Sequence, residues 1–293
     1  MKKQQFTLIP YLQLTRPANL VTALSDILAG MAIGQFLFSE STPFWLLPAT
    51  IGLYGGGVVL NDVFDARLDA VERPERPIPS GKVRLQAAAM MGVLLLIAGI
   101  ILSAIHSPVS ALIAFIIALT TILYNRLAKH HKVAGPVVMG LCRGGNLLLG
   151  ISAVTESVAL WWPIAIVPVI YIGAITLISQ DEVHGGKKQT LLLAGLLYLC
   201  VHLIQLSIAI NEGNGLLALP LIITHAWLIG KPLHNAWKNP VGPLIGKAVK
   251  SGVIALIIMN AVWCIAFGYW PLALAVILLL PVSMWMGKIF AVT

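Results

Sequence analysis

Charge is scarce in this chain of 293 residues: 10% of them are Asp, Glu, Lys or Arg and 58% are hydrophobic, which excludes an ordinary soluble domain. Cysteine is scarce too, and Cys142, Cys200 and Cys264 lie in apolar stretches without metal-ligand spacing, so we expect buried small hydrophobes. Linkers and low-complexity tracts are missing, which favours a single membrane-embedded domain over residues 1–293. A cleavable signal peptide is not expected, because Asp26 interrupts the first apolar stretch.

Ten apolar segments account for most of the sequence and predict an all-α integral membrane protein. Almost no loop precedes the last of them, and the eighth is short enough that we expect it to tilt little or to continue past its apolar residues. The segments cover residues 18–38, 44–60, 86–105, 109–125, 134–155, 159–179, 189–210, 215–230, 250–268 and 270–290.

The basic residues indicate the topology. Of the 19 Lys and Arg, 18 fall at the chain ends or in alternate connections that share one side of the membrane, and only Arg143 lies inside a segment. The opposite connections carry acids such as Glu40, Glu156 and Glu212 but no base. This pattern predicts that both termini and the longer, polar connections are cytoplasmic, as in a bacterial inner-membrane protein. The formal charge of +8 is therefore a topology signal, and nucleic-acid binding is not expected.

The connection from Asn61 to Gly81 holds five of the eleven acids and three of the bases. On a helix Asp62, Asp65 and Asp69 share one face, and two carboxylates about 5 Å apart repel by roughly 3 kcal/mol at an effective dielectric of 20. They therefore need a cation, and oxygen-only ligands favour Mg²⁺, with Asn61 as a further ligand. The bases that follow, including Arg67 and Arg76, suit a magnesium-bridged diphosphate. The alternative is a solvated, salt-bridged loop.

A second acidic pair, Asp181 and Glu182, follows the sixth segment on the same side of the membrane. The pair is a candidate for binding a second cation, and Lys188 is a candidate for reaching phosphate groups. A plain polar loop is the alternative.

Several polar residues lie within or at the ends of the apolar segments. Asp26 shares a helical stripe with Asn19, and Arg143 shares one with Asn146. An Asp26–Arg143 ion pair and contact with a substrate both account for charges at this depth. Tyr124 and Lys129 lie at the end of the fourth segment. Their position is explained either by snorkelling of the side chains to the membrane surface or by contact of Lys129 with a phosphate group. His202 and His225 are expected to be isolated histidines on apolar helices, and no metal is assigned to them.

These motifs resemble those of the UbiA superfamily of intramembrane prenyltransferases. The resemblance rests on Asn61-Asp62-x-x-Asp65-x-x-x-Asp69 followed by the residues at 76–81, and it extends from about Arg16 to Ser251. It is supported by Asn19 after Arg16-Pro17, by the pair Tyr124 and Lys129, and by Asp181-Glu182 at the place of the second acidic motif. Within the superfamily, residues 16–30, 54–66, 140–150 and 182–186 are most similar to the EboC-like branch, which is associated with secondary metabolism.

The resemblance implies a bundle of nine transmembrane helices around a central cavity, here with a tenth C-terminal hydrophobic helix. It implies Mg²⁺-dependent transfer of a prenyl group from a prenyl diphosphate to a hydrophobic or aromatic acceptor within the lipid bilayer. The implied catalytic and metal-binding residues are Asp62, Asp65, Asp69, Asp181 and Glu182, with Asn61 as a further metal ligand. The candidate substrate-binding residues are Asn19, Asn61, Arg67, Arg76, Tyr124, Lys129, Asn146 and Lys188, together with two that are not general features of the family, Arg143 and His184. Arg143 indicates an anionic or carbonyl-bearing acceptor, and His184 is a candidate for contact with the acceptor.

The sequence departs from the family pattern in the second motif, where Ile178 stands in place of a further acid and His184 is unusual. The departure leaves open a non-catalytic lipid-binding or transport-assisting component on the same scaffold. A coupled transporter that uses Asp26 and Arg143 is a weaker alternative, because most acids lie at the membrane edge and not in its middle.

Overall fold

The computed structural model describes residues 8–36, 41–180 and 185–290, and the regular elements in these ranges are helices. Within them, nine helices are long and apolar enough to cross a membrane, and a tenth, α2, is apolar but shorter. The expected all-α membrane bundle is thereby confirmed. These apolar elements are the shorter α2 (Pro17–Ile33) and the nine candidate spans: η1 and α3 (Thr42–Trp45, Leu46–Phe64), α5 (Leu85–His106), α6 and η2 (Pro108–Leu123, Tyr124–Ala128), α7 (Ala134–Ile151), α8, η3 and α9 (Ser157–Trp161, Trp162–Ala165, Ile166–Ser179), α10 (Lys188–Asn211), α11 (Gly215–Lys238), α12 (Gly242–Ala266) and α13 (Trp270–Ile289).

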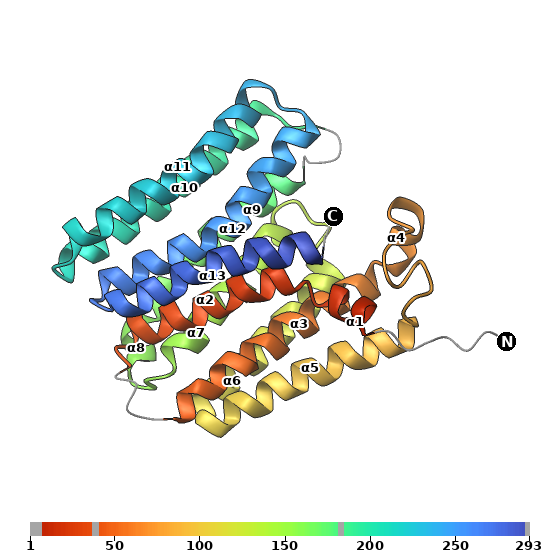
Figure 1. Ribbon diagram of the computed structural model, residues 1–293, viewed down its shortest axis with the longest axis horizontal. Helices are drawn as coiled ribbons and strands as arrows, with labels where there is room; N and C mark the ends of the chain where they lie inside the picture. The colour runs from red at the N-terminus through yellow and green to blue at the C-terminus, as the bar shows by residue number, and fades with distance from the viewer. Residues whose placement is uncertain (1–7, 37–40, 181–184, 291–293) are drawn as a thin grey trace.

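The spanning helices lie side by side, with α2 and α7 in the middle of the bundle (Figure 1). On one side of this central pair are α3, α5 and α6, and on the other are α9 to α12, while α13 packs on α2 and α12. Two short helices, α1 (Ile9–Leu14) and α4 (Ala66–Glu72), lie at the same end of the bundle (Figure 1). That end also holds the polar connection between α3 and α5.

The central pair is held together by two glycines that face each other. A Cβ atom built on Gly30 of α2 would lie 2.5 Å from the carbonyl oxygen of Leu147, and one on Gly150 of α7 would lie 2.5 Å from that of Ile27. Only glycine fits at this distance, and small residues of this kind let membrane helices approach closely. The crossing fixes the relative positions of the polar residues that α2 and α7 carry one to two turns away.

Two helices extend well past the apolar stretches that predicted them. The eighth segment, expected over 215–230, continues as α11 to Lys238, and the ninth begins at Gly242, eight residues before the apolar stretch expected over 250–268. Long basic side chains explain the difference, because Lys can bury its aliphatic stem along a helix while its charged end stays in water. Hydropathy therefore underestimates the length of such helices.

Candidate active site

The first acidic motif lies where α3 ends and α4 begins. Asp65 separates the two helices, and the backbone continues almost without a break, because the Asp65 N–H bonds to Asn61 O and the Asp69 N–H bonds to Asp65 O. Asp62 and Asp69 are buried, with 6% and 4% of their surface exposed. Buried carboxylates require partners, and bases provide them here.

Each of the three aspartates is paired with at least one base. Asp62 accepts a hydrogen bond of 2.6 Å from Arg16, and Asp69 accepts one of 2.8 Å from Arg76, which also lies 3.5 Å from Asp62. Asp65 accepts a hydrogen bond from Lys129. The carboxylates thus alternate with cationic groups along one rim, and we call Arg16, Asp65, Arg73, Arg76 and Lys129, which all line the cavity described below, the charged rim.

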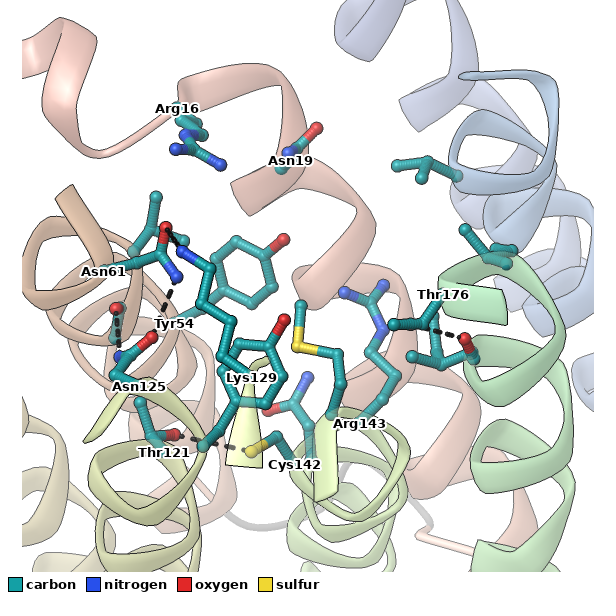
Figure 2. A pocket seen from close by; sticks show the side chains of 18 of the residues that line it. Arg16, Asn19, Tyr54, Asn61, Thr121, Asn125, Lys129, Cys142, Arg143 and Thr176 are labelled. Atoms are coloured by element: carbon teal, nitrogen blue, oxygen red, sulfur yellow. Dashed lines mark hydrogen bonds between the residues drawn. The ribbon is translucent and has the colours of Figure 1, made fainter. Parts of the chain in front are cut away.

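A π-helical turn, η2, brings Asn125 and Lys129 to this rim. The turn widens the end of the fourth spanning helix, and π-turns often occur at functional sites. Asn125 accepts a 2.8 Å hydrogen bond from Asn61 Nδ2 and donates to Gly57 O at 3.2 Å. The Asn61 amide is therefore oriented with its oxygen toward Lys129, whose Nζ lies 3.2 Å away (Figure 2).

A second polar group lies deeper, between α2, α7 and α12. Arg143 Nε lies 2.6 Å from Asp26 Oδ2, and Asp26 also accepts hydrogen bonds from Asn146 (2.9 Å) and Asn260 (2.7 Å). We call Asp26, Arg143, Asn146 and Asn260 the inner cluster. Thr50 on α3 donates to Asn146 Oδ1 at 2.6 Å and joins the cluster to that helix.

A cavity of about 460 Å³ connects the charged rim with the inner cluster. Its walls come from α2, α3, α6, η2, α7, α9 and α12, and between the polar ends they are mostly aliphatic and aromatic, with Tyr54 between the two ends (Figure 2). Arg143 donates to the carbonyl of Thr22, six residues beyond Arg16, so the two polar ends are about 9 Å apart along α2. Eight predicted site residues line this cavity: Asn19, Asn61, Asp65, Arg76, Tyr124, Lys129, Arg143 and Asn146.

Other predicted residues lie elsewhere. Arg67 is exposed on α4, since two residues of helix turn it about 200° away from Asp65. Lys188 is exposed at the start of α10, with its ammonium 5.3 Å from the centre of the Trp237 ring. Neither is among the residues that line the cavity. Asp181, Glu182 and His184 lie outside the described residues.

The sequence interpretation missed three residues of the cavity wall: Arg16, Tyr54 and Asn125. Arg16 entered the sequence interpretation only as part of the Arg16-Pro17 pair before Asn19. Its backbone is left-handed (φ 49°), an uncommon conformation for a residue other than glycine that often marks a functional position. Its place before Pro17 was the available signal. Asn125 could not be placed by a period of 3.6 residues, because the π-turn shifts its register.

The expectation that His202 and His225 are isolated is wrong. His202 Nε2 lies 2.8 Å from His225 Nδ1, and His225 Nε2 lies 3.2 Å from the hydroxyl of Tyr171. The two histidines meet because α10 and α11 are packed neighbours joined by a short connection. Their contact satisfies polar groups in an apolar region.

The oxygen donors of Asn61, Asp62, Asp65 and Asp69 are of the type that Mg²⁺ prefers. No group of three or more His, Cys, Asp and Glu in the described ranges is arranged to hold a metal, because each aspartate is turned toward a base. The composition of the rim still fits a magnesium diphosphate. A ligand that combines phosphate oxygens with a divalent cation can engage the bases and the carboxylates together.

The sequence matches the model of the UbiA prenyltransferase family over residues 23–240. Two relatives are named digeranylgeranylglyceryl phosphate synthase. The one from Methanothrix thermoacetophila is 31% identical over 208 residues, which cover 66% of this chain and 78% of the relative. The one from Methanococcoides burtonii is 34% identical over 149 residues, which cover 48% of this chain and 53% of the relative, so the chain spans about half its length.

Solved structures share the fold. A structure described as a digeranylgeranylglyceryl phosphate synthase in membranes matches with a TM-score of 0.67 and 25% identity, over 89% of this chain and 98% of that one. A UbiA homologue from Aeropyrum pernix K1 matches with a TM-score of 0.70 and 16% identity, over 83% and 96% of the two chains. One from Archaeoglobus fulgidus, bound to DMAPP and Mg²⁺, matches with a TM-score of 0.63 and 14% identity, over 86% and 98%. With its family match, its helical bundle and its charged rim, this chain belongs to the UbiA prenyltransferase family.

Proposed function

We propose that this membrane prenyltransferase moves a prenyl group from a prenyl diphosphate to a membrane-soluble acceptor in a Mg²⁺-dependent reaction. The observation that carries the proposal is the charged rim at the edge of a largely apolar cavity, where three of the bases pair with Asp62, Asp65 and Asp69. The binding of DMAPP with Mg²⁺ by the Archaeoglobus homologue supports it. The whole chain is proposed to act as one domain in a bacterial inner membrane, with the rim and both termini on the cytoplasmic side.

We assign the metal to Asn61, Asp62, Asp65 and Asp69, together with Asp181 and Glu182 of the second motif. Bound Mg²⁺ neutralises charge on the diphosphate oxygens and so makes the diphosphate a better leaving group. Arg16, Arg76 and Lys129 bind the remaining phosphate oxygens, where charge increases as the carbon–oxygen bond breaks.

The cavity below the rim provides the environment for the allylic cation that remains. Tyr54 and Tyr124 line it, and aromatic rings stabilise a nearby positive charge. The apolar wall between the rim and the inner cluster keeps water away from this reactive carbon. The acceptor then forms a bond to the carbon and gives up a proton, which an oxygen of the departed diphosphate accepts.

Two kinds of acceptor have support. The names of the relatives indicate a prenylated glyceryl phosphate, whose prenyl chain would dissolve in the bilayer. An aromatic acceptor of secondary metabolism, expected from the sequence, is the second candidate, and the tyrosines that line the cavity favour it. Both kinds need access from the membrane.

The test uses purified protein in nanodiscs with Mg²⁺, a labelled prenyl diphosphate and either geranylgeranylglyceryl phosphate or a phenolic acceptor. A labelled product from either acceptor class supports prenyl transfer and identifies the class. If neither yields product and Asp62→Asn leaves cellular function intact, the proposal is contradicted. A non-catalytic lipid-binding or transport-assisting component would then explain the chain.

Asn125 is expected to act on the metal through Asn61. Asn125→Leu removes the acceptor that holds Asn61 Nδ2, so the Asn61 oxygen is no longer fixed in its orientation. Loss of such a supporting hydrogen bond typically weakens metal binding about 10–100-fold. The measurement is the Mg²⁺ concentration that gives half-maximal binding of a prenyl diphosphate. Asn125→Asp keeps an acceptor oxygen, so it should retain more of the affinity; equal values for the wild type and Asn125→Leu would contradict this role.

A further inference from the structure

Arg143 has one terminal guanidinium nitrogen, Nη1, that donates no hydrogen bond to a described residue. Its Nε lies 2.6 Å from Asp26, and its Nη2 donates a 2.6 Å hydrogen bond to Thr22 O. Among the described residues the one hydrogen bond that Arg143 makes is from Nη2, because the buried Nε, although close to Asp26, forms none, and Nη1 has no partner either; the side chain is only 6% exposed and lines the cavity. The guanidinium carbon lies 5.7 Å from the centre of the Tyr54 ring, which lines the same cavity. Arg143 thus presents an anchored donor to whatever fills the inner end.

The inner cluster carries no net charge. Asp26 is fully buried and accepts hydrogen bonds from two amides besides its pairing with Arg143, so its carboxylate neutralises the guanidinium. The other bases that line the cavity belong to the charged rim, and the nearest along α2, Arg16, lies about 9 Å before Thr22, whose carbonyl holds the guanidinium. An anionic group beside Arg143 would therefore be desolvated without a compensating charge, which is costly. An uncharged oxygen beside Arg143 would not carry this desolvation cost.

Stability alone is a weak explanation for this ion pair. A buried ion pair is often replaceable by apolar residues without loss of stability, and ionisable groups within a membrane are costly and usually functional. A pair kept only for structure would not need a free donor facing a cavity. The free nitrogen therefore points to a ligand.

We propose that Arg143 Nη1 donates a hydrogen bond to an uncharged carbonyl, hydroxyl or ether oxygen of the acceptor, and that Asp26 makes this subsite selective for uncharged groups. The proposal rests on the prenyl-transfer function and defines the inner end of the acceptor site. An acceptor that carries a phosphate would place it at the charged rim, away from Arg143. Arg143 is then a specificity-determining residue.

The test compares two unreactive probes of matching shape, 2-acetylnaphthalene with a neutral carbonyl and 2-naphthoate with a carboxylate. Full-length protein in nanodiscs is first saturated with Mg²⁺ and a prenyl thiodiphosphate, so that the bases of the rim are occupied. Equilibrium binding then gives the dissociation constant of each probe. The wild type should bind the neutral probe at least about tenfold more tightly than the carboxylate.

Three variants separate the two roles. Asp26→Asn with Arg143→Met keeps the cluster neutral but removes the donor, and it should bind the neutral probe about tenfold more weakly while its thiodiphosphate affinity stays within about twofold. Asp26→Asn alone leaves an unneutralised guanidinium and should reverse the preference toward 2-naphthoate. Arg84→Met, which removes an exposed base outside the cavity, should behave as the wild type.

Each other outcome overturns the proposal. A neutral-oxygen subsite would be contradicted if the wild type bound 2-naphthoate more strongly than the neutral probe. It would also be contradicted if the double variant bound the neutral probe as the wild type does, or if neither probe bound. In these cases the thiodiphosphate still binds, so the proposed prenyl transfer is unaffected. If the thiodiphosphate itself fails to bind with Mg²⁺, the proposed function fails and the acceptor subsite fails with it.

Discussion

Asp65→Ala is expected to lower the rate of prenyl transfer about 1,000-fold or more, which corresponds to roughly 4 kcal/mol of lost transition-state stabilisation. Asp65 is the one aspartate of the first motif that lines the cavity, and it is paired with Lys129. Its loss removes a proposed Mg²⁺ ligand and frees the Lys129 ammonium to move. The measurement is the single-turnover rate with labelled prenyl diphosphate and acceptor.

A matched control removes a carboxylate from the same connection without touching the cavity. Glu72 is exposed at the end of α4, so Glu72→Gln should keep wild-type activity. The melting temperature of Asp65→Ala should stay close to that of the wild type, because Asp65 is partly exposed at a helix junction. Wild-type turnover by a folded Asp65→Ala protein would exclude the proposed role.

Gly150→Leu is expected to destabilise the protein by about 3 kcal/mol or more. The Cβ alone would lie 2.5 Å from the carbonyl oxygen of Ile27, so α7 must move away from α2. The movement would also separate Arg143 and Asn146 from Asp26, and activity should fall with stability. Thermal unfolding in detergent, followed by loss of helical signal or by aggregation, measures the effect.

Gly230→Leu is the control for this substitution. Gly230 is also inside a helix, but a Cβ there meets no atom within 4 Å. The change should be neutral or slightly stabilising, because leucine has a higher helix propensity than glycine. Equal melting temperatures for Gly150→Leu and Gly230→Leu would show that the α2–α7 crossing is not close-packed.

The membrane bundle could be predicted because the hydropathy of each segment and the positions of the basic residues can be read from the sequence without knowledge of tertiary contacts. Eight predicted site residues line one cavity, and they were predictable because the spacing of Asn61 and Asp65 and the polar residues in apolar segments are visible without tertiary structure. The partners of these residues were not predictable. Arg16 and Asp62 are 46 residues apart, and only the packing of α1 and α2 against α3 brings them together.

Local geometry accounts for the remaining differences. The three carboxylates were expected to share one face of a helix and to need a cation. In the structure each pairs with a base, because buried charges require partners: Asp62 with Arg16, Asp65 with Lys129 and Asp69 with Arg76. A hydropathy pattern contains no sign of the π-turn that brings Asn125 to Asn61. The Asp26–Arg143 ion pair was one of two open explanations, and the structure shows this ion pair with Arg143 also lining the cavity, so contact with a substrate stays a prediction.

The most direct test of a magnesium diphosphate site at the charged rim is equilibrium binding of prenyl diphosphates of several chain lengths to purified protein in nanodiscs, with Mg²⁺ or with EDTA. The wild type should bind at least one chain length only when Mg²⁺ is present. Asp62→Ala and the volume-preserving Asp62→Asn should lose this binding while remaining folded. Absence of binding at every chain length, or equal binding in EDTA, would contradict the site.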